Sequence, residues 1–102
     1  MAFSKMKLPS PKVVNKRKEN YDIYIGRGSI WGNPFEIGKD GNREECIRLY
    51  ANWIMKQPQL ISKLRFLAGK RLGCYCKPKD CHGDVLVELF ELLEEHGKNG
   101  YN

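Results

Sequence analysis

The stretch that decides the fold is Leu72-Gly73-Cys74-Tyr75-Cys76-Lys77-Pro78-Lys79-Asp80-Cys81-His82-Gly83-Asp84. Residues Arg71–Cys76 place alternate side chains on opposite faces, which predicts a strand. Pro78 ends that strand, because proline offers no N–H to a ladder. A helix to about His96 follows at once, with Asp80 as its expected N-cap and Asp84 as the alternative cap. The stretch therefore predicts a strand–turn–helix unit.

Three cysteines and one histidine in this stretch mark it as the expected working site. Cys81 and His82 fall at the start of the helix, where free N–H groups and the helix dipole attract anions and lower thiol pKa. Three interpretations stay open. One is a zinc site built from Cys74, Cys76, Cys81 and His82, whose residue types suit zinc although their spacing does not. The others are a metal-free thiolate–imidazole site and buried cysteines that only fill the core.

The metal-free site is favoured over zinc, because a parallel sheet should hold together without a metal ion. Zinc stays an alternative, and the sequence does not otherwise specify a cofactor. If the metal-free site is an enzyme's, Cys76 or Cys81 is the nucleophile, His82 the base and Asp84 the residue that orients the base. Adjacent residues on a helix point about 100° apart, so Cys76 is the better partner for His82 than Cys81 is.

Two strands are expected before this unit. The residues Lys12–Lys16 form a candidate edge strand, whose lysines would blunt an exposed edge. The residues Tyr21–Gly26 form a clearer strand with alternating apolar positions. The short polar link Arg17–Asn20 predicts an antiparallel hairpin between the two.

Two helical segments are expected between the second and third strands. Asn42 suits the N-cap of the first, since Glu45 follows at the capping-box spacing, and this helix runs to about Gln57. Pro58 suits the start of a second helix, which ends by Gly69.

The resulting order, β-β-α-α-β-α, predicts an α/β fold with a small three-stranded mixed sheet, one parallel strand pair and helices packed on it. The helical crossover between the second and third strands makes these two parallel. Parallel strands end at one edge of the sheet, where ligands bind in open α/β sheets. The segments Gly26–Phe35 and Cys76–His82 are therefore expected to meet.

The segment Gly26–Phe35 is expected to be an ordered loop, because it combines three glycines with a proline and two aromatic residues. Four of its side chains suit a phosphate-bearing ligand, by pairing with an anion, hydrogen bonding or stacking on a base: Arg27, Ser29, Trp31 and Asn33. The alternative is that Trp31 and Phe35 fill the core while Arg27 makes a surface ion pair.

The chain has 102 residues and a net charge of +6, and its basic residues gather at the start. The expected organisation is a flexible basic leader at 1–11, one α/β domain at 12–96 and a loose tail at 97–102. The first 20 residues hold six basic residues against one acidic residue, which accounts for five of the six net charges. This feature predicts either an arm that touches nucleic acid or a solvated tail.

The sequence has neither a membrane-length apolar run nor the apolar core of a signal peptide. It therefore predicts a cytoplasmic protein with reduced thiols and no membrane partner.

Four motifs stand out in combination: Tyr24-Ile25-Gly26-Arg27, Trp31-Gly32-Asn33-Pro34-Phe35, Gly73-Cys74-Tyr75-Cys76 and Cys81-His82-Gly83-Asp84-Val85-Leu86. Together they resemble the uncharacterised family called domain of unknown function 4326, over roughly residues 13–93. Gly28 stands where proline is common in that family. The resemblance implies a small protein of phages or bacteria, in a phage or mobile-element context, and it implies no activity.

The leading functional expectation is a domain that binds a nucleotide or nucleic-acid phosphate at the carboxyl edge of the sheet. The first alternative is the Cys/His-dependent enzyme described above, acting on a nucleotide-like substrate. The second is an interaction module for nucleic acid or a host protein, with a structural Cys/His zinc site. The sequence does not specify an oligomeric state.

Overall fold

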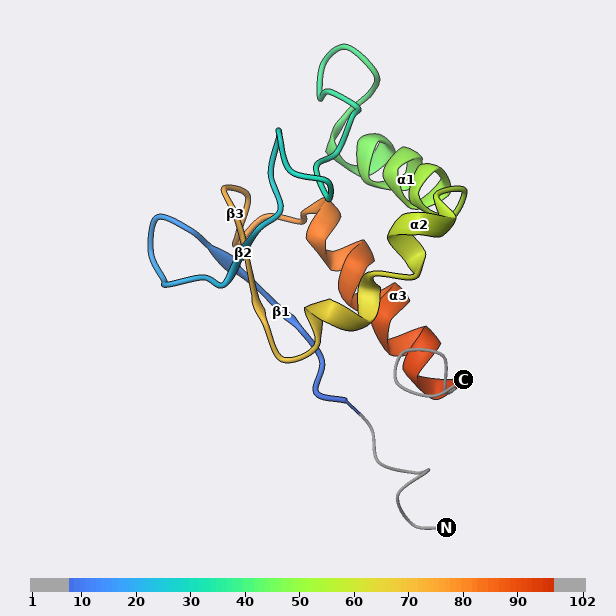
Figure 1. The fold of residues 1–102 in the computed structure, drawn as a ribbon. Coiled ribbons are helices and arrows are strands. Elements are labelled where there is room, and N and C mark those ends of the chain that lie inside the picture. Colours follow the sequence, from blue (N-terminus) through green and yellow to red (C-terminus); the bar gives the residue numbers. More distant parts are fainter. Residues whose placement is uncertain (1–7, 97–102) are drawn as a thin grey trace, which may run out of the picture.

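A computed structural model describes residues 8–96 of the chain (Figure 1). Its elements are β1 (Lys12–Asn15), β2 (Ile23–Tyr24), α1 (Arg43–Ile54), α2 (Pro58–Ile61), the 3₁₀ helix η2 (Leu64–Leu67), β3 (Arg71–Cys74) and α3 (His82–Glu95). The order of strands and helices is the predicted one, except that the second helical segment is split into α2 and η2. None of the helices in this part of the chain combines the length and apolar character of a membrane span.

All three strands are parallel, in the order β1-β3-β2. The α/β class and the parallel pairing of β2 with β3 are confirmed, and so is the position of β1 at an edge. The predicted antiparallel hairpin is wrong, because β3 lies between β1 and β2. The link of residues 16–22 can reach about 25 Å, which is enough to cross β3 and return to the start of the next strand. This arrangement pairs the most buried strand on both sides.

The crossing link covers one face of the sheet. A Cβ atom added to Gly73 would lie 2.7 Å from the Tyr21 ring, so the ring sits directly on the central strand. Val14, which is in register with Gly73, is buried on this face. The Lys16 N–H donates to the Cys74 carbonyl at 2.8 Å and begins the link at the end of β3.

The helices lie on the other face, where α3 packs between the sheet and α1 (Figure 1). The contact is close at Gly83, where an added Cβ would lie 2.6 Å from Ile25 Cδ1 and 3.0 Å from Val13 Cγ2. Much of the core fills the space between these layers: Ile25, Trp31, Tyr50, Ile54, Leu64, Leu67, Leu72 and Leu86 are all buried.

The helix starts agree with the sequence in α1 and differ in α3. Asn42 caps α1 and forms the predicted capping box with Glu45. The N-cap of α3 is Cys81, and not Asp80 or Asp84. Its backbone is extended, its sulfur accepts the Gly83 N–H at 3.3 Å, and its own N–H donates to the Asp84 carboxylate at 3.0 Å. A cysteine takes this position because it can cap the helix and still be buried.

The expected leader is partly held in place. The Leu8 N–H donates to the Glu94 carboxylate of α3 at 2.6 Å, and the Pro9 carbonyl accepts from the Gly69 N–H at 2.9 Å. The flexible leader at 1–11 stays a prediction, and residues 8 and 9 of it make these two hydrogen bonds. Residues 1–7 and the expected tail at 97–102 lie outside the described part of the chain.

Candidate functional site

A cavity of about 590 Å³ opens at the carboxyl edge of the sheet. Three segments form it: the loop after β2, the start of α1 and the turn between β3 and α3. The residues that bring polar or thiol groups to its wall include Arg27, Asn33, Glu36, Arg43, Cys74, Cys76, Asp80, Cys81 and His82. The predicted meeting of the segments 26–35 and 76–82 at one edge of the sheet is confirmed.

Arg27 borders the cavity and is held only loosely. Its guanidinium lies 3.5 Å from the carbonyl oxygens of Asn33 and Phe35 and 4.0 Å from the Glu36 carboxylate. The side chain is 62% exposed, so an ion pair at this distance contributes little. The guanidinium is therefore free to turn toward an anion that enters the cavity.

Asn33 holds the loop in place instead of offering free groups. Its Oδ1 accepts the Phe35 N–H at 2.9 Å, and its Nδ2 donates to the Cys46 carbonyl of α1 at 3.3 Å. These two bonds fix the loop on α1 and keep Arg27 at the rim. The role of Asn33 is thus positional, although it lines the cavity as the sequence predicts.

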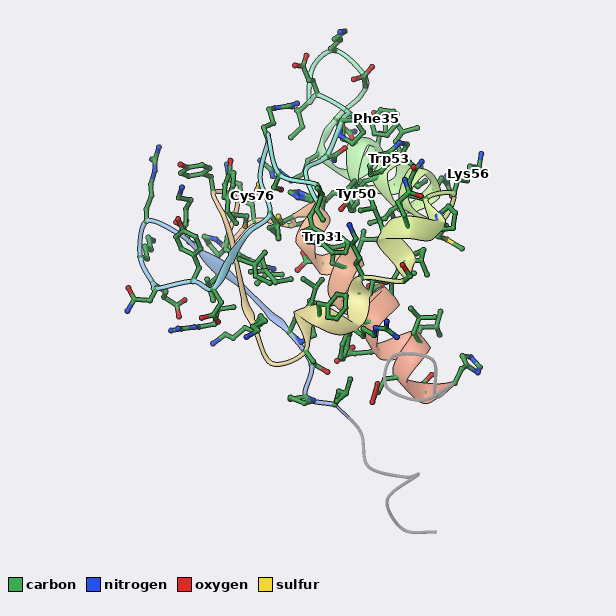
Figure 2. All side chains as sticks on the ribbon, in the orientation of Figure 1. Trp31, Phe35, Tyr50, Trp53, Lys56 and Cys76 are labelled. Atoms are coloured by element: carbon green, nitrogen blue, oxygen red, sulfur yellow. The ribbon has the colours of Figure 1, made fainter. Side chains whose placement is uncertain are left out.

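The other two expected ligand-binding residues lie away from the cavity. Ser29 Oγ donates to the Gly26 carbonyl at 2.7 Å. Trp31 is 4% exposed, and its carbonyl accepts the Tyr50 hydroxyl at 2.7 Å (Figure 2). The loop folds tightly on itself at Gly32, which turns Trp31 into the core. Trp31 is therefore turned away from the cavity, and Ser29 is already bonded within its own loop.

His82 is a buried ring that joins the start of α3 to the end of β2. Its Nε2 lies 2.7 Å from the Ile25 carbonyl oxygen, and its ring meets the Tyr50 ring edge-on at 4.9 Å between centroids. A carbonyl only accepts hydrogen bonds, so Nε2 carries the proton and Nδ1 keeps its lone pair. Burial lowers the pKa of His82 and keeps the ring neutral.

The lone pair of His82 does not face the predicted partner. Nδ1 lies 3.6 Å from Cys81 Sγ, so Cys81 and not Cys76 is the thiol beside it. The 100° separation of helical neighbours does not apply, because Cys81 is extended. The Ile25 carbonyl orients the ring in this structure, and the orienting role of Asp84 stays a prediction. Asp84 accepts the Cys81 N–H and the Lys77 ammonium, the latter at 2.6 Å.

Cys74 is the thiol with the most strongly stabilised thiolate. A hydrogen bond from the Cys81 thiol, followed by the N–H groups of Lys77 and Cys76, lowers its pKa to about 6 against the opposing effect of burial. The same hydrogen bond, together with burial, raises the pKa of Cys81. Of this pair, Cys74 at the end of the central strand is therefore the thiol whose ionised form is stabilised.

Sequence reasoning assigned Cys74 only to the zinc alternative. The signal that finds it is its place at the last position of the central strand, before a turn that supplies N–H donors. In residues 8–96, no group of three or more His, Cys, Asp or Glu side chains is arranged to hold a metal ion. The bonds of His82 and Cys81 to protein groups do not decide the zinc alternative, because a metal-bound histidine commonly donates its other ring N–H to a backbone carbonyl.

Sequence reasoning also missed Arg43, which was not assigned to the site. Its guanidinium donates to the Asp80 carbonyl at 3.0 Å and borders the cavity from the first turn of α1. Its position beside the N-cap Asn42, directly after the loop, is the signal that places it there. The cavity wall also includes three aromatic side chains that were not assigned to the site: Tyr24, Phe35 and Tyr75.

Comparison with known proteins places these features in a family. Residues 12–92 match the family described as Domain of unknown function (DUF4326). The chain belongs to this family. It is 44% identical over 87 residues to the "Uncharacterized 12.4 kDa protein in nrdA-td intergenic region" of Enterobacteria phage T4, which covers 80% of this chain and 79% of that protein. It is 32% identical over 96 residues to an uncharacterized protein of Acanthamoeba polyphaga mimivirus, which covers 76% of this chain and 73% of that protein.

No solved structure matches this DUF4326 chain. The resemblance stated from four motifs is thus confirmed, and the relatives are small viral proteins whose names state no activity. All four motifs contribute residues to the cavity wall, among them Arg27, Asn33, Cys74 and His82. The geometry of this cavity is therefore the basis for a functional proposal.

Proposed function

We propose that the protein binds a nucleotide, with the phosphate and the base both held in the cavity at the carboxyl edge of the sheet. The observation that carries this proposal is that Arg27, Arg43 and the start of α3 border the same cavity as three aromatic rings. A volume of about 590 Å³ lies within the usual range of roughly 300–1,000 Å³ for small-molecule sites.

Three features support binding of the phosphate. Arg27 and Arg43 each offer a planar fork of donors that matches phosphate geometry. The first turn of α3 adds the positive end of the helix dipole, while its Cys81 and Gly83 N–H groups are bonded within the protein. Glu36, Asp80 and the thiolate form of Cys74 also line the cavity and oppose an anion. Glu36 is half-exposed and 4.0 Å from Arg27, so a phosphate with two donors to bind outcompetes it.

Aromatic side chains support binding of the base. Tyr24, Phe35 and Tyr75 line the cavity, and all three retain solvent-exposed surface. Base–aromatic stacking contributes about 1–3 kcal/mol per base and tolerates different bases. These rings take the role that the sequence assigned to Trp31.

Titration of the ¹⁵N-labelled protein with dTMP, dAMP, thymidine and inorganic phosphate tests the proposal. We expect the monophosphates to shift the amides of residues 26–37 and 74–83, and thymidine to bind at least tenfold more weakly. Arg27→Ala and Arg43→Ala should each weaken monophosphate binding about tenfold, since a charge-assisted hydrogen bond contributes about 1.5–3 kcal/mol. Arg48→Ala is the matched control, because Arg48 pairs with Glu44 on the exposed side of α1.

The proposal fails if monophosphates at millimolar concentration shift none of these amides. It also fails if Arg27→Ala and Arg48→Ala bind equally well. Thermal shift gives an independent measurement, because a ligand at 100 times its Kd stabilises the folded state by about 2.7 kcal/mol.

A second candidate function is a thiol-dependent reaction on a nucleotide-like ligand in the same cavity, and it is favoured by the thiolate character of Cys74. In this version of the enzyme hypothesis the nucleophile is Cys74, and not Cys76 or Cys81. Chromatography of nucleotides incubated with the protein tests it. A product that forms with the wild type and is lost in Cys74→Ser, while nucleotide binding is retained, supports the reaction. No product from any common nucleotide argues against it.

A further inference from the structure

We infer that the cavity wall continues into a surface that binds single-stranded nucleic acid. The inference rests on the proposed function and extends it, because one nucleotide would occupy the cavity and its neighbours would lie on this surface. The surface is the Lys16 cluster, which consists of Lys16, Arg17, Tyr21, Tyr24 and Tyr75. Two of its members, Tyr24 and Tyr75, also line the cavity.

The geometry of the Lys16 cluster alternates cations with aromatic rings. The Lys16 ammonium lies 4.6 Å from the centroid of the Tyr24 ring, 4.9 Å from that of Tyr75 and 5.4 Å from that of Tyr21. The Arg17 guanidinium lies 4.9 Å from the centroid of the Tyr75 ring. These distances are those of cation–π contacts, which fix the rings relative to one another before any ligand arrives.

The rings of the cluster keep much of their surface in water. Tyr75 is 51% exposed and Tyr21 is 39% exposed, and Arg17 is exposed beside them. A hydrogen bond with the Tyr75 hydroxyl raises the pKa of Lys16, so the ammonium stays charged. The cluster therefore offers aromatic faces and fixed positive charge to the solvent at the rim of the cavity.

The charge balance of the crossing link leaves this surface basic. The link carries Lys16, Arg17 and Lys18 against Glu19 and Asp22. Asp22 is paired with Arg71 at 3.3 Å, so its charge is already balanced. The negatively charged phosphodiester groups of a nucleic acid complement the charge of Lys16, Arg17 and Lys18.

Single-stranded nucleic acid fits this chemistry better than a duplex does. A single strand presents unstacked bases to aromatic side chains and phosphates to lysine and arginine, with little dependence on sequence. A duplex hides its base faces and offers only phosphates. Because Tyr75 belongs to both the cavity and the Lys16 cluster, a strand held in the cavity by one phosphate passes next to the cluster.

The test is fluorescence anisotropy with labelled oligo(dT) of two, four, eight and twelve nucleotides and with a twelve-base-pair duplex. We expect affinity to rise over the first few nucleotides and to exceed that for the duplex. The double variant K16A/R17A and the single variant Tyr75→Ala should each weaken oligonucleotide binding about tenfold or more. Loss of two phosphate contacts should also reduce the slope of log affinity against log salt by about 1.4.

The control is K63A/R65A, which removes the same two charges from an exposed segment that precedes β3. It should leave oligonucleotide affinity nearly unchanged. Circular dichroism melts of all variants show that they fold, and Tyr75→Leu supplies a milder change should Tyr75→Ala not fold. K16A/R17A should bind dTMP as the wild type does, which separates the cluster from the cavity.

Three results would overturn the inference. The first is affinity for oligo(dT) that does not rise with length although dTMP binds, which leaves the proposed function intact. The second is equal weakening by K16A/R17A and K63A/R65A, which indicates binding by net charge alone. The third is duplex binding as tight as single-strand binding. Failure of dTMP and of every oligonucleotide to bind would overturn both proposals together.

Discussion

His82 Nε2 donates a hydrogen bond of 2.7 Å to the Ile25 carbonyl, inside the protein and 57 positions away in the chain. The bond joins the residue after β2 to the start of α3. The loop that follows β2 and the turn that precedes α3 both line the cavity. The bond also fixes the neutral tautomer that leaves the Nδ1 lone pair toward Cys81. A shift of this ring would therefore disturb both sides of the cavity.

The first prediction concerns the pH dependence of stability. Burial lowers the pKa of His82 in the folded protein below its usual value of 6.5. Below pH 6.5 the unfolded chain binds a proton at His82 that the folded protein does not bind. The contribution of His82 to the free energy of unfolding is therefore complete above pH 6.5 and is lost as the pH drops toward the folded pKa. Urea denaturation between pH 5 and pH 8 measures this loss.

Two variants make the pH prediction specific to His82. His82→Gln keeps an amide donor for the Ile25 carbonyl, and it should lose stability at pH 7.5 while its free energy of unfolding depends less on pH. His96→Gln changes an exposed ring at the end of α3 and should behave as the wild type does. An undiminished pH dependence in His82→Gln would assign the effect to other groups.

The second prediction separates the observed N-cap of α3 from the one the sequence suggested. Asp84→Ala removes the acceptor of the Cys81 N–H and of the Lys77 ammonium, and it should cost about 1–2 kcal/mol of unfolding free energy. Asp80→Ala should cost less than about 0.5 kcal/mol, because the Asp80 side chain is exposed and only its carbonyl is bonded. A larger loss of unfolding free energy in Asp80→Ala than in Asp84→Ala, measured by chemical denaturation, would support Asp80 as the N-cap of α3.

Local chemistry predicted much of this fold. The capping box of Asn42 and Glu45, the helix start at Pro58 and the strand before Pro78 all depend on neighbouring residues, and each is found in the structure. The parallel pair and the edge of the sheet that holds the cavity followed from the length of the helical crossover. Such features can be predicted because short-range geometry determines them.

Features that depend on long-range packing were predicted poorly. The link 16–22 is short enough for a hairpin, and only the burial of β3 between two partners decides against one. Trp31 has the chemistry of a stacking platform, and only the Tyr50 hydroxyl and the tight turn at Gly32 place it in the core. Cys74 has no distinctive spacing, and its low pKa depends on the approach of Cys81. In each of these cases a contact from elsewhere in the chain decides the role of the residue.

The third prediction concerns the contact between α3 and the sheet. Gly83→Ala would improve helix propensity by at most about 1 kcal/mol. The added Cβ would lie 2.6 Å from Ile25 Cδ1, and overpacking of this kind costs about 1–3 kcal/mol. We therefore expect net destabilisation in thermal and urea unfolding. A Gly83→Ala protein more stable than the wild type would contradict the close packing.

A double-mutant cycle assigns that cost to one atom. Ile25→Val removes the Cδ1 atom that the new methyl group would meet, and alone it should cost about 0.5–1.5 kcal/mol. In the Gly83→Ala background the same change should cost less or should restore stability. Strict additivity of the two effects would show that the strain at Gly83 has another source.

The fourth prediction is that the buried Cys74 thiol ionises below the ordinary pKa of a thiol. Hydrogen bonding lowers its pKa to about 6, whereas burial raises the pKa of Cys46 above its usual value. The rate of iodoacetamide alkylation at Cys74, followed by mass spectrometry of peptides, should rise with pH to a plateau with a midpoint near 6. Cys81→Ala removes the main hydrogen bond to the thiolate and should move that midpoint upward, while Cys81→Ser keeps a donor and should move it less. A wild-type midpoint near 8.5 at Cys74 would remove Cys74 from any thiol chemistry in the cavity.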